Sequence, residues 1–83
     1  MDAARHYEDE ASGLGDDFFD QVYALIERLT VHPESGYLQT KNVRVARVTR
    51  FPYDVFYKVE PDQIFILAVL HQKRRPGLWK NRL

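Results

Sequence analysis

The chain has 83 residues, enough for one small domain, and its 45% hydrophobic and 13% aromatic content is above that of disordered chains. It has no cysteine, which excludes a disulfide framework and a thiolate metal site and is typical of the reducing cytoplasm. No apolar run is long enough to span a membrane, and the acidic N-terminus does not resemble a signal peptide. We therefore expect one cytoplasmic domain over residues 1–83, with no membrane contact.

The formal net charge is zero, but the charges are distributed unevenly along the chain. Residues 1–40 hold nine acidic residues against two basic ones, a balance of −7. Residues 41–83 hold ten basic residues against three acidic ones, a balance of +7. This asymmetry indicates a surface that meets an anion or an acidic partner. The alternative is that the two halves mostly neutralise each other.

Apolar residues at helical spacing predict two helices that form an antiparallel hairpin. The first covers residues 2–11 and ends before the break at residues 13–15. The second starts at Asp16, with Asp16 or Gly15 as its cap. It ends at His32, because a residue before proline avoids the helical region. Its apolar stripe is expected in the core and consists of Phe18, Val22, Leu25, Ile26 and Leu29.

The second half of the chain predicts three strands after a polar loop over residues 34–42. Residues 43–50 mix β-branched residues with arginines, and residues 53–60 alternate between apolar and polar side chains. A tight turn at residues 61–62 leads to residues 64–70, which are apolar on both faces and are expected to form a central strand. The order predicts an α+β domain, a helical hairpin packed on a small antiparallel sheet and followed by a short basic tail.

His71 and three arginines are the candidates for chemistry. His71 ends the last apolar strand, and the basic residues 73–75 favour a neutral imidazole able to take a proton. The alternative is a histidine that only hydrogen-bonds the backbone or helps to bind a partner. Arg44, Arg47 and Arg50 recur every third residue, so Arg47 faces away from the other two in a strand. They suit phosphate or carboxylate binding, and a solvated strand face explains them equally well.

The remaining unusual residues predict no cofactor and no metal site. Trp79 is expected to pack the tail onto the sheet, and its alternative role is to stack on a nucleic-acid base. His6 and His32 have no metal-ligand companions at useful spacing. The chain has no glycine-rich phosphate loop and no serine nucleophile motif.

A set of residues spread over almost the whole chain occurs in the order of one known superfamily. The matching residues are Tyr7, Gly13-Leu14-Gly15, Phe18, Pro33, Arg44, Phe51-Pro52-Tyr53, Tyr57, Ala68-Val69-Leu70-His71, Arg74-Arg75-Pro76, Trp79 and Arg82. In these residues the chain resembles the ParE/RelE toxin superfamily, and most of all the ParE side, the plasmid stabilisation toxins of type II toxin–antitoxin pairs. The resemblance implies a cognate antitoxin as partner.

The resemblance leaves three functions open. A ParE-like toxin inhibits DNA gyrase by protein–protein contact, for which the tail supplies the expected partner-binding residues Arg74, Arg75, Trp79, Lys80 and Arg82. A RelE-like toxin is an endonuclease that cleaves mRNA on the ribosome, and here it would use His71, Arg44, Arg50 and Arg74. RelE-like nucleases commonly place a tyrosine near the C-terminus, whereas no tyrosine follows Tyr57 in this chain. The third function is that of an inactive, truncated remnant that only binds antitoxin.

The N-terminus differs from the family pattern. Family members begin with a β-strand and a longer first helix, and this chain starts inside the equivalent of that helix. We expect the sheet edge left without this strand to be filled by an antitoxin segment or by a second copy of the chain.

Overall fold

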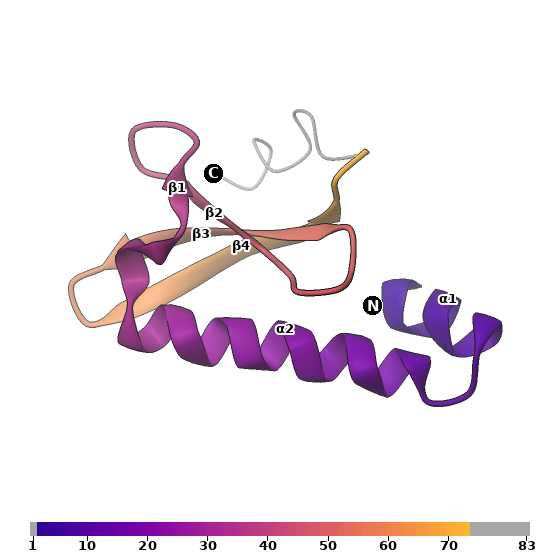
Figure 1. Cartoon of the computed structure of the whole chain (residues 1–83). Coiled ribbons are helices and arrows are strands. Elements are labelled where there is room, and N and C mark those ends of the chain that lie inside the picture. Colours follow the sequence, from indigo (N-terminus) through magenta and orange to yellow (C-terminus); the bar gives the residue numbers. More distant parts are fainter. Residues whose placement is uncertain (1, 74–83) are drawn as a thin grey trace.

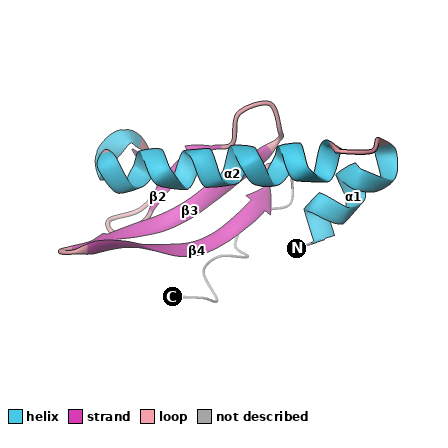
Figure 2. Ribbon diagram, turned by 90° about the horizontal axis from the view of Figure 1, so that it is seen from below, coloured by secondary structure: helices cyan, strands magenta, loops and turns pink. Residues whose placement is uncertain are grey.

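The computed structural model describes residues 2–73 and has two helices followed by a four-stranded antiparallel sheet (Figure 1). In chain order the elements are α1 (Asp2–Glu10), α2 (Leu14–Val31), the short 3-10 helix η1 (Pro33–Ser35), β1 (Tyr37–Leu38), β2 (Arg44–Arg47), β3 (Tyr53–Glu60) and β4 (Gln63–His71). Figure 2 shows α2 running along one face of the sheet, with α1 folded back at its N-terminal end. The predicted α+β fold is confirmed.

The turn between the helices differs from its prediction in where α2 begins and how it is capped. α2 begins at Leu14, two residues before Asp16, and its N-cap is Gly13 with a φ of 87°. That left-handed conformation favours glycine. The Glu8 carboxylate of α1 accepts hydrogen bonds from the backbone N–H groups of Gly13, at 3.0 Å, and Gly15, at 3.1 Å. The capping carboxylate therefore comes from the preceding helix, and the residues at the start of α2 alone do not predict it.

The sheet order is β1-β2-β3-β4, so β4 lies at an edge of the described sheet and the prediction of a central strand at residues 64–70 is wrong. β2 and β3 occupy the centre. The run is apolar because both faces of β4 reach the core: Ile66 and Val69 pack toward α2, whereas Leu67 and Ala68 join a cluster on the opposite face. The pattern of apolar residues along a strand indicates which of its faces are buried. It does not indicate how many strands pair with it.

The region between α2 and β3 contains more structure than the predicted loop at residues 34–42. It holds η1 and the two-residue β1, whose Tyr37 pairs with Val45 and whose Leu38 pairs with Arg44. β2 ends at Arg47, three residues earlier than predicted, and the chain then turns toward β3. Elements this short contain too few residues to show a period of 2.0 or 3.6.

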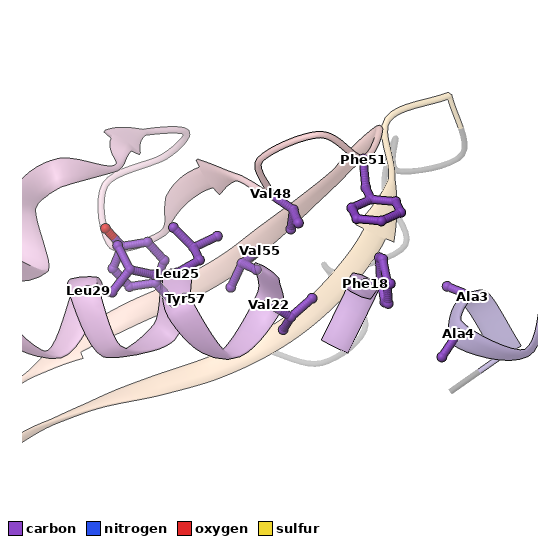
Figure 3. Packing of buried hydrophobic residues seen from close by; sticks show 10 residues of the cluster. All are labelled: Ala3, Ala4, Phe18, Val22, Leu25, Leu29, Val48, Phe51, Val55 and Tyr57. Atoms are coloured by element: carbon purple, nitrogen blue, oxygen red, sulfur yellow. The ribbon is translucent and has the colours of Figure 1, made fainter. Parts of the chain in front are cut away.

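The main core lies between the helices and the sheet (Figure 3). The predicted stripe of α2 is buried at four of its five positions, and Ile26 is partly buried. The stripe packs against Val48, Phe51, Val55 and Tyr57 of the sheet side. A second cluster lies on the other face of the sheet, since strand residues alternate between faces. It consists of Val43, Val45, Phe56, Leu67 and Ala68.

One polar network fixes the C-terminal end of α2 to the sheet. The Tyr57 side chain is fully buried, and its hydroxyl donates to the Pro33 carbonyl at 2.7 Å and accepts from the Gly36 N–H at 3.0 Å. The Arg44 guanidinium donates to the Gly36 carbonyl at 2.7 Å and to the Glu34 carbonyl at 3.3 Å. We call these residues the Tyr57 network; they hold the segment around η1 in place.

Candidate functional site

His71 is the last residue of β4 and lies opposite Tyr53 of β3. The two rings meet edge to face, with their centroids 5.1 Å apart. The His71 Nδ1 atom accepts a hydrogen bond from the Lys73 N–H at 3.1 Å. An imidazole that accepts at Nδ1 carries its proton at Nε2. The ring is therefore left with an N–H donor at Nε2, while its acceptor atom is occupied by the backbone.

Arg44 lies far along the sheet from His71. It pairs with Tyr57, four residues along β3 from Tyr53, which corresponds to about 13 Å of strand. Its guanidinium is bound to the carbonyls of the Tyr57 network. The structure therefore does not bring Arg44 and His71 together.

Arg50 lies at the same end of the sheet as His71. Its turn adjoins the end of β4, because the Gln72 N–H donates to the Pro52 carbonyl at 2.9 Å. Arg50 is exposed and has a φ of 74°, the left-handed region that a residue with a Cβ adopts at a cost. Its guanidinium carbon lies 5.9 Å from the centre of the Phe51 ring, within range of a cation–π contact.

Arg47 faces away from Arg44, as the sequence predicts. Arg44 pairs with Tyr57 on the helix side of the sheet, whereas Arg47 pairs with Asp54 on the other side. Asp54 is only 3% exposed; its carboxylate lies 3.9 Å from the Arg47 guanidinium and accepts from the Gln72 side chain at 3.3 Å. Sequence reasoning did not identify Asp54 as a buried acidic residue, because the alternation over residues 53–60 places it among the polar positions that are expected to face solvent.

The helical layer of the molecule is strongly acidic, whereas the sheet layer is slightly basic. Residues 2–32, the helical part, contain eight acidic residues against two basic ones. Residues 33–73 contain six basic residues against four acidic ones. Neither ion pair among the described residues joins the two halves of the chain, since one links His6 to Glu10 and the other Arg47 to Asp54. The described structure thus gives no support to direct neutralisation between the halves.

Five of the candidate residues lie outside the described part of the chain: Arg74, Arg75, Trp79, Lys80 and Arg82.

Among residues 2–73, no three histidine, aspartate or glutamate side chains are grouped so as to hold a metal ion. Within the same range, neither helix has the length and hydropathy needed to cross a membrane.

The fold is a small α+β domain with acidic helices on a more basic sheet. The family model of the ParE toxin of type II toxin–antitoxin systems, parDE, matches residues 1–76. The chain belongs to this family, which confirms the resemblance seen in the sequence and implies a cognate antitoxin. No curated protein and no solved structure matches the chain significantly.

Proposed function

We propose that this ParE-family chain is a toxin that inhibits DNA gyrase by protein–protein contact and is neutralised by its cognate antitoxin. The observation that supports contact over catalysis is the dispersal of the candidate catalytic groups. Arg44 lies about 13 Å along the sheet from His71 and its guanidinium is bound to backbone carbonyls. The acceptor atom of His71 is taken by the Lys73 N–H. Inhibition by contact requires neither group to be free.

The surface proposed for gyrase is the basic side of the chain. The Arg47 side chain is 74% exposed, although its guanidinium lies 3.9 Å from the Asp54 carboxylate. Arg50 is exposed at the end of the sheet. Guanidinium groups suit such a surface because each binds a carboxylate with two parallel hydrogen bonds. The residues of the tail proposed to extend it are Arg74, Arg75, Trp79, Lys80 and Arg82.

The alternative, a ribosome-dependent mRNA endonuclease of the RelE type, is supported by one observation. His71 and Arg50 lie at the same end of the sheet, where a ring N–H and a guanidinium are both available to a phosphate. A nuclease of this kind would use Arg74 as a further cation and would leave Arg44 with its structural role.

The outer edge of β4 is the proposed place for a partner strand. β4 contains no aspartate, glutamate, lysine or arginine, and no described strand pairs with its outer side. A long, apolar strand edge is a ready template for another strand. An antitoxin segment or a second copy of the chain would extend the sheet there. A homodimer predicts twice the monomer mass in light scattering without antitoxin, and a monomer at high concentration would exclude it.

The deciding experiment is expression of the chain in cells with two measurements, gyrase-mediated DNA cleavage and mRNA cleavage on ribosomes. We expect the gyrase signal, and we expect His71→Ala to change it little. If the chain is a nuclease, His71→Ala lowers mRNA cleavage about 10²–10⁴-fold. His32→Ala, at an exposed histidine beyond the end of α2, is the matched control. Healthy cells with neither signal would contradict both functions and leave an antitoxin-binding remnant.

A further inference from the structure

A second surface, far from His71, has the form of a binding site. It is a hollow of about 450 Å³ at the far end of the sheet, open to solvent, between the loop that precedes β2 and the end of β3. We call it the basic notch. Its walls are formed by Leu38, Lys41, Asn42, Arg44, Lys58, Val59 and Glu60.

The notch exists because β3 is longer than β2. β2 begins at Arg44, opposite Tyr57, so the last three residues of β3 extend beyond it. Successive residues of a strand direct their backbone groups to opposite neighbours. The Tyr53 carbonyl accepts from Val48 on the β2 side, so the N–H and C=O of Val59 also point to that side. None of the backbone hydrogen bonds of the described loops reaches Val59. Val59 therefore offers one donor and one acceptor to an incoming chain.

The side chains around this free backbone combine positive charge with apolar surface. Three cations, Lys41, Arg44 and Lys58, stand against the single carboxylate of Glu60. Leu38 is 56% exposed and Val59 is 44% exposed, so two large apolar side chains are left facing solvent. Arg44 donates a hydrogen bond to the Gly36 carbonyl, so the position of this charge is already fixed before a ligand binds.

This combination fits an acidic peptide better than the backbone of a nucleic acid. A phosphodiester has acceptors only, so it leaves the Val59 carbonyl without a donor. It also gains little from Leu38. An extended peptide has both a donor and an acceptor for Val59, and its side chains alternate between the two faces. A peptide with aspartate or glutamate at one position and an apolar residue at the next would place carboxylates beside the cations and apolar groups beside the apolar side chains of the notch.

We propose that the basic notch binds an extended, acidic segment of the cognate antitoxin, which pairs with the backbone of Val59 and places carboxylates beside Lys41 and Lys58. The proposal rests on the proposed function in one respect, the existence of an antitoxin, and is independent of whether gyrase or mRNA is the target. Charge reversal at the rim of such a site weakens binding without disturbing the fold.

The test is a titration of the full chain with a blocked five-residue peptide of alternating aspartate and isoleucine, followed by amide NMR. The Val59 amide is expected to shift most, and Lys58→Glu to weaken binding about tenfold. Val59→Pro removes the donor at an outward-facing position and is expected to abolish binding.

Lys73→Glu, the same charge change at the other end of the sheet, is the control and is expected to keep the affinity within about twofold. Absence of binding, equal binding of the lysine–isoleucine peptide, or preference for an oligonucleotide would overturn the proposal.

A second experiment distinguishes failure of this proposal from failure of the proposed function. In cells, the Lys58→Glu toxin is expected to arrest growth as the parent does and to resist rescue by the co-expressed antitoxin. Full rescue would overturn the role of the notch. If neither parent nor variant arrests growth, the toxin function fails, and the peptide titration still decides the notch.

Discussion

The two ends of the sheet are held in different ways. At the end near η1, the Tyr57 hydroxyl and the Arg44 guanidinium are hydrogen-bonded to backbone groups of residues 33–36. At the other end, near α1, the contacts are between rings: Phe51 lies 4.8 Å from Tyr7 and 5.2 Å from Phe18, centroid to centroid. Buried hydrogen bonds require particular atoms at particular places, whereas ring packing tolerates changes of shape.

This difference bears on where function can vary. The basic notch adjoins the hydrogen-bonded end through Arg44, so its geometry is set by the fold. His71 and Arg50 adjoin the ring-packed end. We expect substitution of the rings to cost less there, because ring packing tolerates changes of shape. We therefore expect the notch to be the less adaptable of the two surfaces, and the following substitutions test the contrast in stability that underlies it.

Gly36→Ala is expected to have the largest effect. A Cβ at this position would lie 2.5 Å from the Tyr57 hydroxyl and 2.8 Å from the Val45 carbonyl, and the backbone carbonyl cannot move aside. We expect a loss of about 3 kcal/mol in the free energy of unfolding, measured by urea denaturation. Gly13→Ala is the control, because its Cβ meets open space and only its positive φ is strained, at about 1 kcal/mol. Equal losses in the two variants would contradict the contrast.

Tyr57→Phe removes a single oxygen and tests the network itself. The change leaves the buried Gly36 N–H without its acceptor and the Pro33 carbonyl without its donor, at an expected cost of about 2 kcal/mol in the free energy of unfolding. Tyr53→Phe makes the same chemical change at the ring-packed end and is expected to cost less than about 0.5 kcal/mol. If chemical denaturation gives both variants the same midpoint, the hydroxyl of Tyr57 does not stabilise this end.

Phe51→Leu probes the tolerance of the ring-packed end. Phe51 is 7% exposed and makes ring contacts with Tyr7 and Phe18. A leucine keeps most of the apolar volume and loses the edge-to-face contacts, so we expect a loss of about 1 kcal/mol in thermal or urea unfolding. The control is Phe65→Leu, at a ring that is 51% exposed, with a change near zero. A loss at Phe51 greater than that of Tyr57→Phe would reverse the order proposed for the two ends.

The sequence predicts the periodic packing of α2 on the sheet better than the hydrogen-bonded network at one end of it. The helical spacing of Phe18, Val22 and Leu25 predicts the buried stripe, and the alternation over residues 53–60 predicts β3, because burial imposes a regular period. The Tyr57 network has no period. It joins residues 21 and 24 positions apart through a hydroxyl and backbone groups, and backbone groups are common to every residue.

The candidate site shows the same limit. His71 at the end of a strand was predictable, because the apolar run ends there. The separation of Arg44 from His71 depends on the register of β2 against β3, and no pattern within one strand fixes its register against another. The basic notch was not predicted at all, since it arises from the difference in length between two paired strands.

Tyr7→Phe is expected to have the smallest effect, which appears only at alkaline pH. Burial first, and then Tyr53 and Glu10, raise the pKa of the Tyr7 phenol above its ordinary value of 10.0. The folded chain thus holds this proton more tightly than the unfolded chain, so its contribution to stability is complete below about pH 10 and is lost as the pH rises through the raised pKa. We expect the Tyr7→Phe variant to lose less stability than the parent in this range, measured as the urea midpoint at several pH values. Tyr23→Phe, at a ring 61% exposed, should keep the parent's decline. A parallel decline in the parent and in Tyr7→Phe would show that this phenol contributes nothing to the alkaline limit of the ring-packed end.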